Sequence, residues 1–273
     1  MTELQEREFE ILKLFVDICE RLGLTYYLVC GSALGAAKYS GFIPWDDDID
    51  VALPRPDYER FLSAAANLLP DWCFIQNYRT DPEFHLLGTK LRDSRTTYIE
   101  KMTCNLKINH GVFIDVFPLD GYQNNQKIFI KSRRVYEARR RIRLNYNRFS
   151  RENILNLRTN FYYINYKLFG LYSDSAKAAE DYENLLKSQD VYNSKIWCNY
   201  ANSVSEREFS PREYYGSGTT AEFEGLPVRI PEKYDEYLTQ KYGDWRADLP
   251  EEEKKGHHHY EICDLSRPYT YYC

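Results

Sequence analysis

Apolar residues near the start of the chain recur with the spacing of an amphipathic helix. Between positions 4 and 22 they appear every three or four residues among charged ones: Phe9, Leu12, Phe15, Val16 and Cys19. This spacing places them on one face, which a helix buries against the rest of the protein. Gly23 follows the last turn of the pattern and is the expected end of the helix.

A strand, a tight turn and a short helix are expected next. Residues 25–30 are an apolar run of strand length, and Gly31 follows them. Ser32 has a hydroxyl suited to capping a helix N-terminus, which predicts a short helix over residues 33–39. Backbone amides at the start of that helix would face an anion such as a phosphate, and Gly31 would allow its close approach.

Two later segments have the two-residue period of strands and carry carboxylates. Residues 48–53 alternate between polar and apolar positions, so Asp48 and Asp50 are predicted to point to the same side of a strand. Residues 111–117 alternate in the same way and place Asp115 on a further strand. If the two strands are neighbours, three carboxylates approach one another.

The remaining patterns mix helices with short strands and favour an α+β protein. We expect a helix over 57–69, strands over 73–77 and 86–91, a basic tyrosine-rich helical segment over 126–170, a helix over 175–187, strands around Val228 and a helix over 232–242. Such an order suits a mixed sheet with flanking helices. We expect a core over 1–124, a helical subdomain over 125–190 and a C-terminal part over 191–273 that completes the active site.

Composition and cysteine usage are typical of a globular protein in a reducing compartment. At 273 residues the chain is long enough to bury a substantial core. Its seven cysteines are scattered and include no Cys-x-x-Cys pair, which suits reduced thiols and predicts a cytoplasmic location. We expect no signal sequence and no membrane span, because no apolar run reaches the roughly 18 residues that a span requires.

Charge is unevenly distributed along the chain. The net charge is −5, yet residues 127–158 hold eleven Lys or Arg and only two Glu. The simplest interpretation of this block is a solvated helical face. The alternative is peripheral attraction to the anionic inner face of a membrane, where a lipid-linked glycan would lie. Because the whole chain is acidic and lacks a recognition motif, we expect no nucleic-acid partner.

The densest chemical feature is the aspartate cluster at positions 46, 47, 48 and 50. Carboxylates this close repel one another unless a cation or solvent screens them. An isolated Asp-x-Asp is often only a solvated turn, but this one follows a strand, a Gly-Ser turn and a short helix, as is typical of the nucleotidyltransferase superfamily. Asp48 and Asp50 would then bind Mg²⁺ or Mn²⁺, with Asp115 as a third ligand.

Several segments together resemble the LicD family of bacterial phosphocholine transferases. The longest is GSALGAAKYSGFIPWDDDIDVALPRPDY over residues 31–58, and the others lie at 90–97, 111–120, 223–245 and 250–259. They cover most of the chain except its basic, tyrosine-rich middle. Animal fukutin and fukutin-related protein, which transfer ribitol phosphate from a CDP-linked donor, are similar more distantly.

The resemblance implies a nucleotidyltransferase-like catalytic core and a defined reaction. Phosphocholine from CDP-choline, or the phosphoryl-alcohol group of another CDP-alcohol, would pass to a sugar hydroxyl and release CMP. The acceptor would be a cell-surface glycan, such as a teichoic acid or a lipopolysaccharide, or its lipid-linked precursor. The metal at Asp48 and Asp50 would neutralise the donor diphosphate. Asp115 would be the third ligand or the base that takes the acceptor proton, and Asp46 competes for the base role.

Further residues are expected to bind the donor or the acceptor. Phosphates need cations beyond one metal ion, and the candidates are Lys38, Arg55, Lys90 and Arg92. Each of these could equally be a solvated charge. His258 and His259 match the family's C-terminal histidines, which implies a role near the acceptor or a phosphate; consecutive histidines do not suit a zinc site. Trp45 either contacts a quaternary ammonium or belongs to the core.

Two other functions fit the same sequence. A nucleotidyltransferase would pass a nucleoside monophosphate from a triphosphate to a small molecule or a protein, and it would release pyrophosphate where the first reaction releases CMP. A noncatalytic glycan- or lipid-binding protein would have a decayed site, which the intact Asp48, Asp50 and Asp115 oppose.

Overall fold

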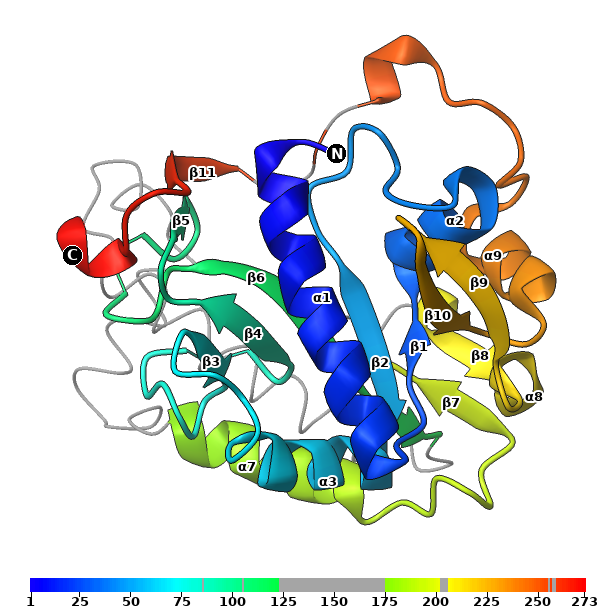
Figure 1. Cartoon of the computed structure of the whole chain (residues 1–273). Helices are drawn as coiled ribbons and strands as arrows, with labels where there is room; N and C mark the ends of the chain where they lie inside the picture. Colours follow the sequence, from blue (N-terminus) through cyan, green and yellow to red (C-terminus); the bar gives the residue numbers. More distant parts are fainter. Residues whose placement is uncertain (85, 105, 123–174, 202–205, 255, 257–258) are drawn as a thin grey trace, which may run out of the picture.

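A mixed β-sheet crossed by one long helix forms the centre of the molecule (Figure 1). This computed structural model describes residues 1–84, 86–104, 106–122, 175–201, 206–254, 256 and 259–273. The basic segment predicted to be helical over 126–170 lies outside them, as does His258. The helical subdomain proposed over 125–190 is therefore described only from Ser175 to its end.

The order of the strands places β2 beside β6. The path runs through β1 (Tyr27–Leu28), β2 (Asp50–Pro54), β6 (Val112–Gly121), β4 (Thr89–Asp93) and β3 (Cys73–Gln76); β7 (Ile196–Cys198) joins the end of β6, and β8 (Phe209–Pro211) pairs with β7. β2 and β6 are parallel, whereas the other pairs on this path are antiparallel. This mixed sheet, with helices packed on it, confirms the predicted α+β class.

Helix α1 (Glu3–Leu22) forms where the apolar spacing predicts it. Thr2 and Gln5 make a reciprocal capping box at its N-terminus. At the other end Gly23 adopts a left-handed φ of 61°, which glycine reaches without the steric cost of a Cβ. The apolar face packs on β6 and β4, so α1 lies across the sheet (Figure 1).

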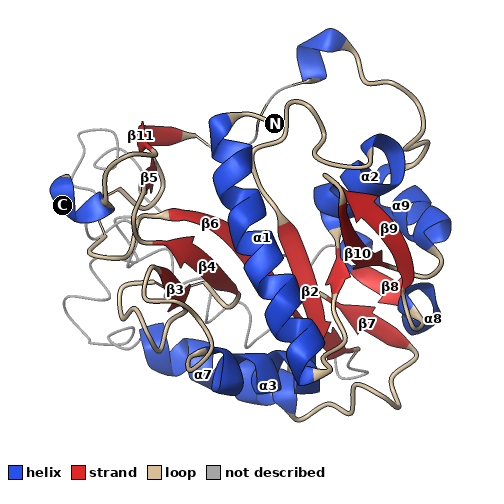
Figure 2. Cartoon of the chain, in the orientation of Figure 1, coloured by secondary structure: helices blue, strands red, loops and turns tan. Residues whose placement is uncertain are grey.

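The other elements surround the sheet (Figure 2). The helices are α2 (Cys30–Tyr39), α3 (Arg55–Ala65), α7 (Ser175–Lys187), α8 (Arg212–Tyr215) and α9 (Tyr234–Tyr242), with 3-10 turns η1 (Glu206–Glu208), η2 (Glu251–Glu253) and η3 (Tyr269–Tyr271). Two antiparallel pairs stand apart from the sheet: β9 (Thr219–Phe223) with β10 (Leu226–Ile230), and β5 (Thr97–Glu100) with β11 (Tyr260–Asp264). Within the described part of the chain, none of the helices combines the length and apolar character needed to cross a bilayer.

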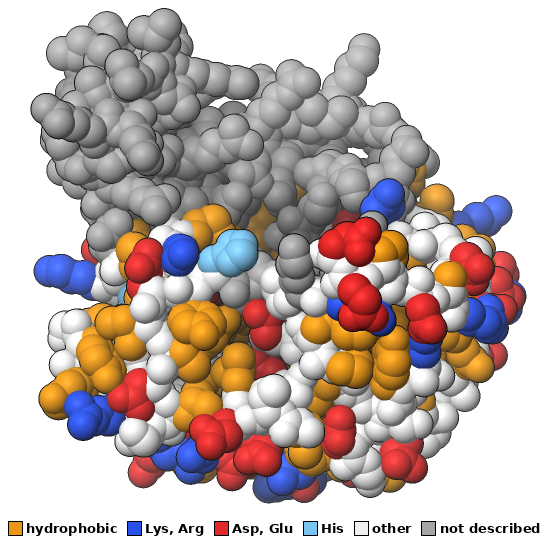
Figure 3. Space-filling model, turned by 90° about the horizontal axis from the view of Figure 1, so that it is seen from above, with side chains coloured by type: hydrophobic (Ala, Val, Ile, Leu, Met, Phe, Trp, Pro, Cys, Tyr) orange, Lys and Arg blue, Asp and Glu red, His pale blue; other side chains and the backbone are white. Residues whose placement is uncertain are grey.

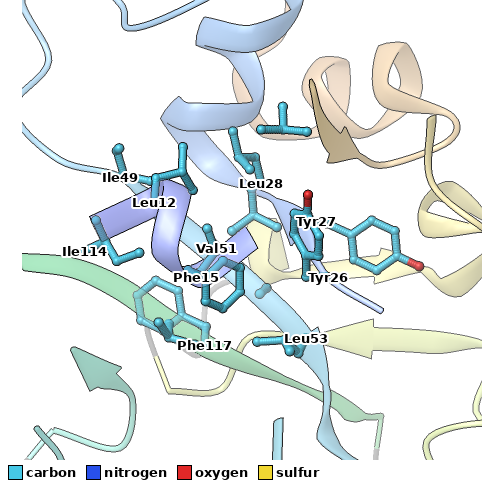
Figure 4. Close-up of a cluster of buried hydrophobic side chains, with 14 of the residues drawn as sticks. Leu12, Phe15, Tyr26, Tyr27, Leu28, Ile49, Val51, Leu53, Ile114 and Phe117 are labelled. Atoms are coloured by element: carbon cyan, nitrogen blue, oxygen red, sulfur yellow. The ribbon is translucent and has the colours of Figure 1, made fainter. Parts of the chain in front are cut away.

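The core lies between α1 and the sheet (Figure 4). Leu12 and Phe15 of α1 face Val51 of β2 and Ile114 of β6, and all four side chains are fully buried. Burying a side chain of this size stabilises a protein by roughly 1.5–3 kcal/mol. This packing fixes β2 and β6, and with them the carboxylates that they carry.

Two predicted boundaries near the aspartates are wrong. Helix α2 begins at Cys30 rather than after Ser32, and its N-cap residue Val29 makes no side-chain hydrogen bond. Ser32 instead lies inside the helix, and its Oγ accepts a 2.8 Å bond from the backbone N–H of Asp50. The strand predicted from Asp48 begins only at Asp50, because the preceding residues form a loop.

Candidate active site

Strand pairing places Asp50, Asp115 and Lys90 in one row across the sheet. Asp50 on β2 is the register partner of Asp115 on β6, which is in turn the partner of Lys90 on β4. Register partners point to the same side of a sheet. The Lys90 ammonium lies 3.1 Å from Asp115 Oδ2 and 3.2 Å from the centre of the Phe113 ring, and only 5% of the lysine side chain is exposed.

Negative charge is concentrated at this row. Burial, followed by the neighbouring carboxylates of Asp48, Asp115 and Asp46, raises the pKa of Asp50 well above its ordinary value, and Lys90 opposes the shift. A raised carboxyl pKa means that the surroundings disfavour the anion. Burial disfavours any charge, but the neighbouring carboxylates would favour a cation.

The loop before β2 is held by contacts on both sides. Gln5 of α1 donates a 2.9 Å bond from Nε2 to the carbonyl oxygen of Asp46. Gly31 at the start of α2 faces the Asp46 carboxylate so closely that an added Cβ would lie 2.7 Å from Oδ2. An added Cβ on Gly256 would lie at the same distance from Asp47 Oδ2, so the C-terminal segment passes beside the loop.

A cavity of about 310 Å³ opens at this loop. Its lining combines acidic, aromatic and aliphatic side chains: Cys30, Gly31, Leu34, Lys38, Tyr39, Ile43, Trp45, Asp46, Asp48, Asp50, Tyr242, Asp244, Trp245, Ala247 and Leu249. Seen from above, acidic side chains are spread over the described surface, and some are recessed near its centre (Figure 3). Asp46, Asp48 and Asp50 therefore share one cavity, although Asp48 and Asp46 lie in the loop.

The carboxylates suit a hard divalent cation by their chemistry. Mg²⁺ and Mn²⁺ prefer oxygen ligands, and Mg²⁺ usually completes its shell with water and substrate phosphate. Within the described residues, no three His, Cys, Asp or Glu side chains are placed to hold a metal ion together. An ion held by Asp48 and Asp50, which share the cavity, would therefore take its remaining ligands from water and substrate oxygens.

The predicted phosphate-binding cations fall into two groups. Lys38 lines the cavity, where its ammonium bonds to the carbonyl oxygens of Arg246 and Ala247 at 3.0 and 2.9 Å. Lys90 lies in the carboxylate row. The structure does not bring Arg55 or Arg92 to the cavity.

Both arginines donate their hydrogen bonds to buried acceptors instead. Arg55 makes two 2.7 Å bonds to Asp120 and pairs with Glu183. It follows the C-terminal end of β2, about 17 Å along the strand direction from Asp50. Arg92 is fully buried and bonds to Gln76 Oε1 and the Gly111 carbonyl oxygen, both at 2.6 Å.

The C-terminal histidines are described only in part, since His258 lies outside the described residues. His259 is exposed, and its carbonyl oxygen accepts a 2.8 Å bond from the backbone N–H of Lys101. That bond continues the β5–β11 pairing. The backbone of Gly256, three residues earlier, lies so close to Asp47 that an added Cβ would be 2.7 Å from Oδ2. This segment therefore borders the aspartate loop.

Sequence reasoning missed Glu8, a buried carboxyl group on α1. Only 3% of Glu8 is exposed, and its Oε2 has no hydrogen-bond partner among the described residues. Burial and then Asp48, Asp47 and Asp46 raise its pKa well above the ordinary value. The sequence does contain a signal for its burial, because Glu8 falls on the same helix face as Leu12 and Phe15.

The fold and the site define a class of protein. Two parallel strands that carry carboxylates, beside a helix with Gly-Ser in its first turn, are typical of a nucleotidyltransferase domain. Residues 23–161 match the family model described as LicD/FKTN/FKRP, nucleotidyltransferase domain. A lipopolysaccharide cholinephosphotransferase LicD of Haemophilus influenzae is 31% identical to this chain over 91% of the chain and 92% of the relative. The chain therefore belongs to the LicD family and is an enzyme of the phosphotransferase type. The resemblance found in the sequence is confirmed.

Proposed function

We propose that this enzyme transfers phosphocholine from CDP-choline to a sugar hydroxyl of a cell-surface glycan or its lipid-linked precursor, and that it uses Mg²⁺ or Mn²⁺. The proposal is carried by the carboxylate cavity in a chain that is 31% identical to a lipopolysaccharide cholinephosphotransferase. Asp46, Asp48 and Asp50 line this cavity together with Gly31 at the start of α2, where the helix dipole favours the phosphates of the donor.

Asp48 and Asp50 would hold the cation through their carboxylate oxygens. Bound there, it would offset the charge of the donor diphosphate and of the departing CMP. Ser32 supports this arrangement indirectly, because its hydroxyl fixes the backbone of Asp50 at the start of β2. Lys38, on the cavity wall, and Lys90, beside Asp115, would add positive charge near the phosphates.

The transfer moves one phosphorus between two oxygens. The acceptor hydroxyl oxygen attacks the phosphorus of the choline phosphate, the bond from that phosphorus to the bridging oxygen breaks, and CMP leaves with the oxygen. The hydroxyl proton passes to a carboxylate. We assign this role to Asp46, because it lines the cavity, whereas Asp115 is paired with Lys90 and does not line the cavity.

Product analysis tests the reaction. We expect CMP release from CDP-choline that requires Mg²⁺ or Mn²⁺ and increases with a glycan acceptor, and we expect Asp48→Asn to reduce it by at least about a hundredfold while the fold is retained. Release of pyrophosphate from a nucleoside triphosphate would instead indicate nucleotidyl transfer. Glycan binding without release of either product would indicate a noncatalytic protein.

A second partner is proposed for the basic block over 127–158, which lies outside the described residues. Its eleven Lys or Arg would attract an anionic leaflet that carries the lipid-linked acceptor. In flotation with phosphatidylserine vesicles, we expect binding at low salt and release at high salt. A chain that stays unbound at low salt would contradict membrane contact.

A further inference from the structure

The cavity combines aromatic rings with unbalanced negative charge. Tyr39 of α2, Trp45 of the following loop, Tyr242 of α9 and Trp245 beyond it all contribute to the lining. The charged lining residues are four aspartates and one lysine. A divalent cation bound at Asp48 and Asp50 would offset only part of this negative charge. A ligand that also carries a fixed positive charge would suit it.

Tyr39 and Trp45 form a corner of this cavity. Their ring centres are 6.3 Å apart, and the ring planes meet at 78°. This is an edge-to-face pair, and because both rings also line the cavity, each can offer part of its surface to a methylated ammonium group bound there. Asp46 and Asp48, immediately after Trp45 in the sequence, add anionic charge to the same lining.

Each ring of this corner already carries a lysine of the chain, Lys38 over Tyr39 and Lys254 over Trp45. The Lys254 ammonium is 5.4 Å from the centre of the Trp45 ring, within the range of cation–π attraction. Lys254 also pairs with Glu251 of η2, and 24% of its side chain is exposed. Trp45 itself is partly exposed, and its ring accommodates a positive group.

We propose that the Tyr39–Trp45 corner binds the quaternary ammonium of the donor, and that Lys254 occupies this position until the donor displaces it. The choice of donor rests on the proposed function. A trimethylammonium group has no N–H to donate, so it binds through ring faces and diffuse negative charge rather than through directed hydrogen bonds. Glycerol and ribitol donors carry no cation there. An ethanolamine donor is more strongly hydrated.

Calorimetric titration of Trp45→Leu with CDP-choline, CDP-ethanolamine and CDP-glycerol, each with Mg²⁺, tests the subsite. We expect CDP-choline to bind about tenfold more weakly than to the wild type, which is the size of a cation–π contact removed from a partly desolvated site. Binding of CDP-glycerol should stay within about twofold. Lys254→Met should bind CDP-choline a few-fold more tightly, because the competing ammonium is gone.

Trp72→Leu is the matched control, since Trp72 also carries a cation, Arg95 at 4.1 Å, but does not line the cavity. It should leave all three affinities unchanged. Equal weakening of all three donors by Trp45→Leu, or unchanged binding of CDP-choline, would overturn the subsite. A wild-type protein that binds phosphocholine through Trp45 but releases no CMP from CDP-choline would preserve the subsite and remove the proposed reaction.

Discussion

Asp50 and Asp115 are register partners on the parallel strands β2 and β6, and Lys90 approaches Asp115 from β4 on the same side. The row therefore carries two carboxylates and one ammonium, all largely buried. Parallel pairing is what makes the arrangement possible, because both aspartates stand near the N-terminal ends of their strands. The Lys90 side chain is then a counter-ion that the fold supplies on one side of the row.

Replacing Lys90 by methionine should expose the repulsion within the row. Removing one partner of a buried ion pair leaves an uncompensated charge, so we expect the free energy of unfolding of the chelator-treated protein to fall by about 3–5 kcal/mol. Added Mg²⁺ should then raise the melting temperature more in Lys90→Met than in the wild type, because binding to the folded state stabilises it. Thermal unfolding with EDTA and with excess Mg²⁺ measures both effects.

The control combines Lys90→Met with Asp115→Asn. Removing both charges should cost less stability than Lys90→Met alone, because the neutral amide needs no counter-ion. If Lys90→Met unfolds at the wild-type temperature in EDTA, the ion pair does not support the fold and the row is not coupled.

Glu8 should make stability depend on pH. Its pKa is raised well above 4.5 by burial and by Asp48, Asp47 and Asp46, so the folded protein retains a proton that the unfolded chain releases near pH 4.5. The free energy of unfolding therefore falls as pH rises from about 4.5 through the folded-state pKa. Glu8→Gln has no proton to release, and its stability relative to the wild type should increase with pH.

Urea unfolding in EDTA at pH 5, 6.5 and 8 measures this difference. Glu10→Gln is the matched control on the same helix, since 43% of the Glu10 side chain is exposed. Its profile should run parallel to that of the wild type. A parallel profile for Glu8→Gln as well would show that Glu8 ionises in the folded protein at little cost.

The sequence predicted those features that depend on local periodicity or on a long motif. The helix over 4–22 required only apolar spacing and Gly23. Asp48 and Asp50 were expected on one face of a strand, but the strand begins at Asp50, and the loop before it brings Asp48 to the same cavity. Which residue a polar side chain pairs with is not decided by its neighbours in the sequence. Whether Arg55 meets a phosphate or Asp120 depends on a residue 65 positions away, and whether Ser32 caps its own helix or bonds to Asp50 depends on how α2 packs against β2.

Gly31 should be required for the position of Asp46. A methyl group at Gly31 would lie 2.7 Å from Asp46 Oδ2, so Gly31→Ala must displace that carboxylate. If Asp46 is the base, transfer should slow by about 10²–10⁴-fold with little change in stability. Turnover and thermal unfolding of the same preparation separate the two effects.

Gly225→Ala is the control, in which we expect stability to fall and transfer to stay unchanged. Gly225 has a φ of 81° and no atom within 4 Å of an added Cβ. Alanine there should cost about 1 kcal/mol of stability through backbone strain and leave transfer unchanged. Normal activity in Gly31→Ala would mean that the Asp46 carboxylate can move without consequence, and the base would have to be sought at Asp115.

Substitutions of Arg55 can distinguish a structural role of this residue from a phosphate-binding role. Its two 2.7 Å bonds to Asp120 join the start of α3 to the end of β6, and Asp120 is fully buried. Arg55→Met should lower the free energy of unfolding by about 3–5 kcal/mol, because it leaves the Asp120 charge buried and unpaired. The KM for CDP-choline of the protein that remains folded should not change.

Two further variants make the result for Arg55 decisive. Arg55→Lys keeps the charge but loses the bidentate geometry, so it should recover only part of the stability and remain foldable if the methionine variant does not. Arg60→Met removes an ion pair with Asp57 in which 59% of the arginine side chain is exposed, and it should cost less than about 1 kcal/mol. If Arg55→Lys unfolds like the wild type yet raises the KM for CDP-choline severalfold, Arg55 contacts the donor. Its ion pair with Asp120 would then have to open when the donor binds.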